Sequence, residues 1–252
     1  MLTNSAIYPV CQKTEILIPA DKRLLTSIIV VAWDLNRIQR QITSACLGNI
    51  SKYTDREDYE FIFIDQCNKK ENLDNRHNVI DIDKYIKLAN NIGMSAAMNL
   101  GYKNSNSDYK YICFMHNDVF VPDNWLKKMV EIAEKTGQAV MPCQGHIDRN
   151  YVKKAYIEES FRSNDDAGMI LMTKEAFKKT GGWDERFKTI YQDVPMRMRI
   201  GSFVCTNQVI ITHIGAVSYS VSEEVENEAY TREGPIFNDL RDKGTGKEIN
   251  YL

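Results

Sequence analysis

Three polar residues, His116, Asn117 and Asp118, follow the largely apolar and aromatic run 109–114 after a single Met115. This run is too short for a typical helix and has the composition of a buried strand. In an open α/β sheet, ligands bind at the carboxyl ends of the strands, which is where these three side chains would stand. A carboxylate there can hold a divalent cation, and the cation can hold a diphosphate. An Asp118 that only caps a turn is the alternative interpretation.

Two earlier apolar runs also lead to an aspartate. Residues 27–32 are mostly β-branched and are followed by Trp33 and Asp34, and residues 59–65 end in Asp65. These runs alternate with helical patterns along the chain, which predicts a mostly parallel sheet with helices on both faces. Right-handed crossovers place the carboxyl ends of such strands on one edge. We therefore expect the three aspartates to line a single crevice.

Other elements follow from hydrophobic periodicity and turn residues. The remaining expected strands are residues 15–19, 78–82, 138–142, 167–172 and 203–212. The expected helices are one that Asp34 caps, the small-residue segment 95–101, one after Pro122 that Gly137 ends, residues 174–179 with Thr173 as cap, one that opens within 191–195, and one in the tail. Residues 145–166 are polar and are expected to be irregular.

The composition narrows the class of protein. The chain has 252 residues, a hydrophobic fraction of 43% and a net charge of −2 from 32 basic and 34 acidic residues. The hydrophobic fraction predicts a folded core, and the charge balance argues against nucleic acid as a partner. No apolar run approaches the roughly 20 residues that span a bilayer, and the N-terminus lacks a signal-peptide pattern. The six cysteines are far apart without a C-x-x-C pair, so we expect reduced thiols in a cytoplasmic protein rather than disulfides or structural zinc.

Three common catalytic and nucleotide-binding motifs are absent from the sequence. There is no G-x-G-x-x-G after the first strand, no G-x-x-x-x-G-K-[ST] loop and no G-x-S-x-G elbow. These absences argue against a dinucleotide-binding protein, a Walker-type ATPase and an α/β-hydrolase. The remaining candidates for chemistry are the strand-end carboxylates, Asp193 at an expected helix start and His213 at an expected strand end.

The order and spacing of several motifs resemble the family 2 glycosyltransferases of the GT-A fold, close to the rhamnosyltransferase-like members, from about Ser27 to Ser220. The motifs are the strand 60–65 ending in Asp65, Asn91-x-Gly93-x-x-x-Ala97-x-Asn99-x-Gly101, His116-Asn117-Asp118, Gly181-Gly182-Trp183-Asp184-Glu185-Arg186-Phe187 followed by Gln192-Asp193-Val194, and His213-x-Gly215-x-x-Ser218. The chain departs from the family at His116, where Asn or Asp is usual, and at Gln192, where Glu is usual.

The resemblance implies an inverting, metal-assisted transfer of a sugar from a nucleotide-diphosphate sugar to an acceptor hydroxyl. Asp193 would be the general base that takes the hydroxyl proton, a role worth ~10²–10⁴-fold in rate. Asp118 would bind a divalent metal, Mn²⁺ or Mg²⁺, with His213 and His116 as further ligands. The implied substrate-binding residues are Trp33, Asp34, Asp65, Asn99, Asn117, Trp183 and Asp184.

Each of these roles has a structural alternative. Asp193 could be a helix N-terminal charge, His213 a buried core histidine and Trp33 a packing residue. Asp65, which the resemblance places on the nucleotide base, could be a turn residue. Trp183, expected in the acceptor wall, could belong to the core.

We expect a single α/β domain of the GT-A, Rossmann-like fold over residues 1–252. Its nucleotide-sugar-binding half is expected at 27–142, a smaller acceptor-side half at 143–221 and a tail at 222–252. The expected enzyme is a hexosyltransferase of polysaccharide or glycoconjugate synthesis whose acceptor is a sugar, lipid-linked or protein-linked hydroxyl. The expected location is the cytoplasm, with peripheral association with the inner face of the membrane as a further option.

Two other functions compete with this one. A non-catalytic relative of the same fold would bind a nucleotide-sugar or a glycan without transferring a sugar. A nucleotidyltransferase that makes the sugar donor would need a glycine-rich loop after the first strand, and residues 33–36 contain no glycine.

Overall fold

The computed structural model describes residues 24–67, 79–146, 161–162, 168–215 and 223–243. The strands are β1 (Thr26–Ala32), β2 (Tyr59–Asp65), β3 (Lys84–Lys87), β4 (Tyr111–His116), β5 (Val119–Phe120), β6 (Ala139–His146), β7 (Phe161–Arg162), β8 (Met169–Thr173) and β9 (Phe203–His213). The helices are α1 (Arg37–Tyr53), α2 (Met94–Lys103), α3 (Trp125–Thr136), α4 (Lys174–Thr180), α5 (Asp193–Ile200) and α6 (Glu223–Lys243). The strand expected at 15–19 lies outside the described residues.

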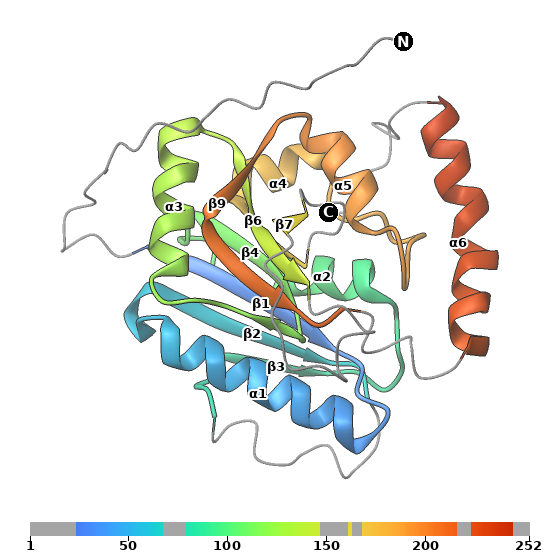
Figure 1. The fold of residues 1–252 in the computed structure, drawn as a ribbon, viewed down its shortest axis with the longest axis horizontal. Helices are drawn as coiled ribbons and strands as arrows, with labels where there is room; N and C mark the ends of the chain where they lie inside the picture. The colour runs from blue at the N-terminus through green and yellow to red at the C-terminus, as the bar shows by residue number, and fades with distance from the viewer. Residues whose placement is uncertain (1–23, 68–78, 147–160, 163–167, 216–222, 244–252) are drawn as a thin grey trace.

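One sheet holds all of these strands in the order β3-β2-β1-β4-β8-β6-β9-β5, with β7 paired to β6. Figure 1 shows the neighbouring strands β3, β2, β1 and β4. β1, β2, β3 and β4 are mutually parallel, and β8 runs antiparallel to both β4 and β6. β6 is parallel to β9, which is antiparallel to β5. Six of the nine strands, all except β5, β7 and β8, therefore point the same way, which confirms the mostly parallel sheet.

Helices cover both faces of the sheet, as the alternation predicted. Ile28 and Val30 of β1 pack in a core cluster with residues of α1 and α3. Ile29 and Val31 of the same strand pack in a second cluster with residues of α2, α4 and α5. Successive side chains of a strand point to opposite faces, so one apolar strand supplies both layers.

The first helix begins later than expected. Its N-cap is Asn36 rather than Asp34: the Asn36 side chain accepts the backbone N–H of Gln39, and the Gln39 side chain accepts that of Asn36. This reciprocal pair is a capping box, which satisfies two of the donors that a helix start leaves open. Asp34 is fully buried instead and accepts a hydrogen bond from Thr43 at 2.9 Å.

The third strand also lies further along than predicted. Residues 79–82 are not a strand, and the pairing with β2 starts at Lys84, opposite Ile62. Asp83 explains this position because its carboxylate accepts the N–H of Phe61 at 2.6 Å, while its own N–H bonds the Phe61 carbonyl at 3.0 Å. Ile80 is buried as part of the core. Its apolar character thus reflects packing of a loop, which periodicity cannot separate from a short buried strand.

Glycine allows α2 to approach the sheet closely. A Cβ atom at Gly101 would lie 2.6 Å from Cγ2 of Ile29 in β1 and 3.2 Å from Cδ1 of Ile64 in β2. Real Cβ atoms essentially never come within 3.0 Å of such a neighbour, so the contact with Ile29 requires a glycine at this place. The small-residue segment predicted as a tightly packed helix is confirmed as α2.

Replacement of Gly101 by alanine is expected to destabilise the protein by about 1–3 kcal/mol, because overpacking forces the branched Ile29 side chain to move. For a chain of this size that lowers the melting temperature by roughly 2–4 °C per kcal/mol in a thermal-shift measurement. Gly48→Ala is the matched control. It lies inside α1, where the nearest atom to an added Cβ is 4.0 Å away, and should gain up to about 1 kcal/mol in helix propensity. Equal melting temperatures for the two variants would contradict this account of the packing.

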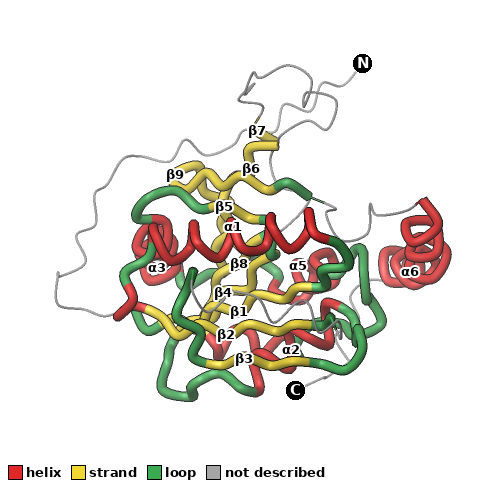
Figure 2. The backbone as a smooth tube through the Cα atoms, turned by 90° about the horizontal axis from the view of Figure 1, so that it is seen from below, coloured by secondary structure: helices red, strands yellow, loops and turns green. Residues whose placement is uncertain are grey.

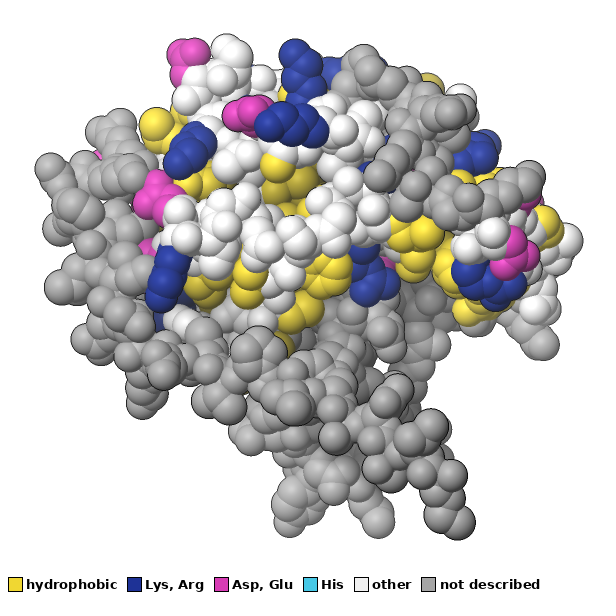
Figure 3. All heavy atoms as spheres, turned by 90° about the horizontal axis from the view of Figure 1, so that it is seen from above, with side chains coloured by type: hydrophobic (Ala, Val, Ile, Leu, Met, Phe, Trp, Pro, Cys, Tyr) yellow, Lys and Arg dark blue, Asp and Glu magenta, His cyan; other side chains and the backbone are white. Residues whose placement is uncertain are grey.

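The helix α6 stands to one side of the sheet in two perpendicular views (Figures 1 and 2). Within the described part of the chain, every helix is too short or too polar to cross a membrane. On the face seen from above, basic and acidic side chains are scattered among neutral ones and do not form a single charged patch (Figure 3).

Candidate active site

A pocket of about 390 Å³ opens at the carboxyl ends of the parallel strands. Its wall is completed by the segment 188–194, which includes the start of α5, and by Tyr230 and Phe237 of α6. Six residues that the sequence nominated line this pocket: Trp33, His116, Asn117, Asp118, Asp193 and His213. The proposed metal ligands and the proposed general base therefore share one cavity.

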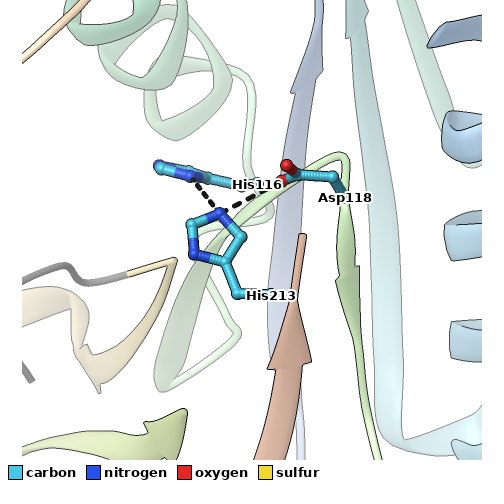
Figure 4. Close-up of side chains that lie close together, drawn as sticks. All are labelled: His116, Asp118 and His213. Atoms are coloured by element: carbon cyan, nitrogen blue, oxygen red, sulfur yellow. Dashed lines mark hydrogen bonds and ion pairs between the residues drawn. The ribbon is translucent and has the colours of Figure 1, made fainter. Parts of the chain in front are cut away.

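The histidines and Asp118 form a compact cluster (Figure 4). His116 ends β4, Asp118 lies in the turn that follows, and His213 ends β9. The pairing of Val119 in β5 with His213 brings these distant segments together. Nε2 of His213 lies 3.2 Å from Oδ1 of Asp118 and 3.3 Å from Nδ1 of His116. All three candidate ligand atoms lie within 4.8 Å of one another, which is a spacing that a divalent ion could bridge.

The surroundings keep the Asp118 carboxylate charged. Burial alone would raise the pKa of Asp118, but the hydrogen bond from His213 and the charges of His213 and His116 outweigh it and lower this pKa below its ordinary value. Behind the cluster, Oε1 of Gln144 lies 3.3 Å from Nδ1 of His213. With Nδ1 donating a hydrogen bond to this oxygen, loss of the Nε2 proton would turn the Nε2 lone pair toward the cluster, which is the arrangement of a metal-binding histidine.

Gly168 supports both histidines. Its carbonyl accepts the backbone N–H of His116 at 2.9 Å. A Cβ atom in its place would lie 2.8 Å from Nδ1 of His213. The imidazole of His213 therefore packs directly against the backbone of Gly168.

Gly168→Ala is expected to displace the His213 ring and to weaken Mn²⁺ binding by about 10–100-fold, the usual cost of disturbing a residue that orients a metal ligand. A Mn²⁺ titration followed by thermal shift measures this, with Gly48→Ala as the control. Unchanged Mn²⁺ affinity in Gly168→Ala would mean that the position of the His213 ring does not matter for the metal.

Asp34 supports the turn that carries Asn117. Nδ2 of Asn117 donates to Oγ1 of Thr43 at 2.7 Å and to Oδ1 of Asp34 at 3.3 Å. Thr43 belongs to α1, so this buried triad joins the helix to the turn between β4 and β5. Asn117 lines the pocket and Asp34 does not.

Asp65 likewise lies beneath the pocket surface. Its carboxylate accepts the hydroxyl of Tyr85 at 2.7 Å and the N–H of Cys67 at 2.9 Å. The next residue, Gln66, lines the pocket and accepts the N–H of Ile92 at 2.9 Å. Of the three strand-end aspartates expected in one crevice, only Asp118 lines the pocket.

Asn99 of α2 holds the turn that contains Trp183 and Asp184, which precedes the pocket segment 188–194. Asn99 of α2 accepts the N–H of Trp183 at 2.8 Å and donates to its carbonyl at 2.9 Å. Trp183 is buried edge-on against Phe114, with ring centroids 5.2 Å apart, and Asp184 pairs with Arg186 at 2.7 Å. None of these three predicted substrate-binding residues lines the pocket.

Asp193 is the first residue of α5 and faces the pocket. Nη2 of Arg197 lies 2.9 Å from its Oδ2, one helical turn away. The helix N-terminus and this cation both favour the ionised carboxylate. Its side chain is mostly buried, so the carboxylate is shielded from bulk water.

Several pocket residues are not among the site residues predicted from the sequence. Lys188, Tyr191 and Arg197 lie in or just before α5, and Tyr230 and Phe237 come from α6. The Asn91-x-Gly93 motif could have pointed to Lys188, because Gly93 has a φ of +93° and a Cβ there would lie 2.9 Å from the Lys188 side chain. Only the fold reveals which residue the glycine accommodates.

A mostly parallel sheet with a pocket at its strand ends and a His-Asp-His cluster in that pocket is the arrangement of an α/β protein with a ligand site at the sheet edge. Residues 27–198 match the family model described as "Glycosyl transferase family 2". The chain belongs to this family, and the predicted resemblance is confirmed. No curated protein matches the chain in sequence.

Solved structures confirm the fold at low sequence identity. The mannosyltransferase PcManGT from Pyrobaculum calidifontis, in complex with GDP-Man and Mn²⁺, has a TM-score of 0.60 at 11% identity, over 89% of this chain and 77% of that one. GalNAc-T7 with UDP, GalNAc and Mn²⁺ has a TM-score of 0.59 at 14% identity, over 83% of this chain and 50% of that one. S. aureus TarS 1–349 has a TM-score of 0.58 at 12% identity, over 82% and 64%. This chain thus matches half to two thirds of the length of the last two.

Proposed function

We propose that this chain is an inverting glycosyltransferase that moves a hexosyl group from a nucleotide-diphosphate sugar to an acceptor hydroxyl. One observation carries the proposal: the His116–Asp118–His213 cluster and Asp193 line the same pocket. Residues 27–142 would form the nucleotide-sugar-binding half and 143–221 the acceptor half.

The ligand set suits a divalent metal. Two imidazole nitrogens and one carboxylate oxygen suit a first-row transition metal, and Mg²⁺ prefers oxygen ligands, so Mn²⁺ fits better than Mg²⁺. A bound divalent ion would stabilise the negative charge that develops on the departing diphosphate. The GT-A structures of PcManGT and GalNAc-T7 with Mn²⁺ support this assignment.

The protein's own residues supply the remaining steps. Asp193 accepts the proton of the acceptor hydroxyl while the hydroxyl oxygen bonds to the anomeric carbon of the donor. Because the leaving diphosphate departs from the opposite side, the configuration at that carbon inverts. Lys188 and Arg197, which also line the pocket, add positive charge near the diphosphate, and Trp33 and Asn117 contact the donor.

We further propose a sugar, lipid-linked or protein-linked acceptor in polysaccharide or glycoconjugate synthesis, with the protein acting in the cytoplasm or at the inner face of the membrane. The free thiols of Cys46 and Cys113 support a reducing compartment. Both are buried, and burial raises the pKa of each far above its ordinary value, so these cysteines are unreactive core residues.

The first test is a thermal-shift panel of nucleoside diphosphates with and without Mn²⁺. A ligand at 100 times its Kd stabilises the native state by about 2.7 kcal/mol, which raises the melting temperature by several degrees. We expect a shift with at least one nucleoside diphosphate, larger with Mn²⁺. If no diphosphate shifts the melting temperature under either condition, the donor assignment is wrong.

A non-catalytic nucleotide-sugar or glycan binder is the second candidate. The observation that favours it is the ion pair between Asp193 and Arg197, because a bound cation lowers the basicity of a carboxylate. The two functions differ in one assay. A binder keeps the nucleotide shift but releases no nucleoside diphosphate when the donor sugar and a panel of acceptors are supplied.

A further inference from the structure

We propose that Glu233 of α6 is a positioning residue that fixes the pocket loop, residues 188–192, and thereby sets Asp193 toward the acceptor. This inference rests on the proposed function and assigns a role to a helix outside the family match, which covers 27–198. The carboxylate of Glu233 is completely buried, although α6 is otherwise a polar helix on the side of the molecule (Figure 1).

The Glu233 carboxylate binds two consecutive backbone donors of the loop. Its two oxygens lie 3.1 Å from the N–H nitrogen of Thr189, and Oε2 lies 2.8 Å from that of Ile190. Arg232 donates to Oε1 at 2.6 Å and to the hydroxyl of Thr189 at 3.0 Å. Hydrogen bonds to a charged acceptor are stronger than neutral ones, and a buried carboxylate is tolerated only when it is satisfied in this way.

Aromatic residues on the same face of α6 as Glu233 also contact this loop. Tyr191 stacks on Phe237 with ring centroids 4.5 Å apart and an angle of 14°, and it meets Tyr230 edge-on at 6.1 Å. Residues 230, 233 and 237 are three and four positions apart, which places them on one face of the helix. Tyr191 also has a φ of +58°, a left-handed conformation that is unfavourable for this residue type unless contacts maintain it.

These contacts affect the proposed reaction because the loop leads directly into α5, which carries Asp193. The carbonyl of Tyr191 accepts the N–H of Val194 in the first turn of α5, at whose start Asp193 stands. The other end of the loop is fixed separately, since the N–H of Met94 in α2 bonds the carbonyl of Lys188 at 2.8 Å. Loss of the Glu233 contacts would therefore free the part of the loop next to Asp193.

The metal cluster belongs to other elements and would stay in place. His116, Asp118 and His213 are held by β4, β5 and β9. Tyr230 and Phe237 line the pocket as well as holding the loop, so α6 is part of the pocket wall. The expected signature of a Glu233 variant is thus intact nucleotide binding combined with impaired transfer to the acceptor.

The test compares Glu233→Ala and Glu233→Gln with Glu228→Gln in the full chain. Glu228 is a matched control because it lies on the same helix, also pairs with Arg232, and has a side chain that is 74% exposed. Hydrogen exchange measured by mass spectrometry should show the Thr189 and Ile190 amides exchanging roughly 10–100-fold faster in Glu233→Ala, the factor for loss of a hydrogen bond to a charged group. Glu233→Gln keeps one acceptor oxygen and should fall between Glu233→Ala and the unmodified chain.

Kinetic assays of the same variants test the consequence for transfer. We expect kcat/KM for the acceptor to fall by about 10–100-fold in Glu233→Ala, since a misplacement of about 1 Å at a reacting group has an effect of this size. The Mn²⁺-dependent nucleotide shift should stay at the value of the unmodified chain, which also proves that the variants are folded. Unchanged hydrogen exchange at 189–190, or faster exchange with unchanged kcat/KM, would overturn the proposal. Failure of the proposed function would look different, because the melting temperature of the unmodified chain would then not respond to nucleotides. The hydrogen-exchange rates of Thr189 and Ile190 would still decide whether Glu233 holds the loop.

Discussion

Asp193→Asn is expected to lower kcat by about 10²–10⁴-fold while donor binding stays intact. Asparagine has nearly the same shape as aspartate but cannot accept the proton of the acceptor hydroxyl, and general-base catalysis contributes a factor of this size. In free energy the loss corresponds to about 3–5 kcal/mol of transition-state stabilisation. The measurement is release of nucleoside diphosphate in the presence of acceptor, next to the Mn²⁺-dependent nucleotide shift.

Asp123→Asn provides the control for Asp193→Asn, because it makes the same chemical change at an exposed position before α3. It should leave both kcat and the nucleotide shift unchanged. Normal sugar transfer by Asp193→Asn would show that another group takes the proton. A loss of the nucleotide shift in this variant would place Asp193 in the donor site instead of at the acceptor.

Asp118→Asn is expected to weaken Mn²⁺ binding by at least about 100-fold, since it removes the only carboxylate of the cluster and leaves the two imidazoles. The nucleotide shift should then lose its Mn²⁺ dependence, and transfer should fall by about 10²–10³-fold, as when one group that stabilises developing charge is removed. Isothermal titration with Mn²⁺ and the thermal-shift panel measure the two effects.

The matched variant for Asp118→Asn is Asp65→Asn, which alters another buried aspartate at a strand end. Asp65 accepts hydrogen bonds from Tyr85 and Cys67 and does not line the pocket. The Asp65→Asn variant should therefore have a lower melting temperature and an unchanged Mn²⁺ response. Identical Mn²⁺ responses in Asp118→Asn and the unmodified chain would exclude Asp118 as a ligand.

Much of the fold follows from local patterns in the sequence. The apolar runs at β1, β2 and β4 are typical of buried parallel strands, and the small residues of α2 match its close approach to Ile29. Gly137 ends α3 in a left-handed conformation and Thr173 caps α4, as their residue types predict. These features depend on near neighbours in the chain, which is why periodicity and turn chemistry find them.

The candidate site is only partly accessible to such reasoning. Asp34, Asp65 and Asp118 all follow apolar runs, but only the three-dimensional arrangement determines which carboxylate reaches the pocket and which meets Thr43 or Tyr85. The position of Trp183 cannot be predicted from local sequence either, because its burial against Phe114 depends on how β4 and the 181–187 turn pack. Glu233 is one acidic residue among many in a charged segment, and only its burial against the pocket loop distinguishes it.

The two-residue strand β5 has a consequence for how the protein matures. Its pairing with β9 joins His116 and His213, which are 97 positions apart in the chain. A fragment that ends before His213 lacks one of the three ligand groups, since His213 is the last residue of β9. A divalent ion that needs all three groups would therefore be bound only after β9 has joined the sheet.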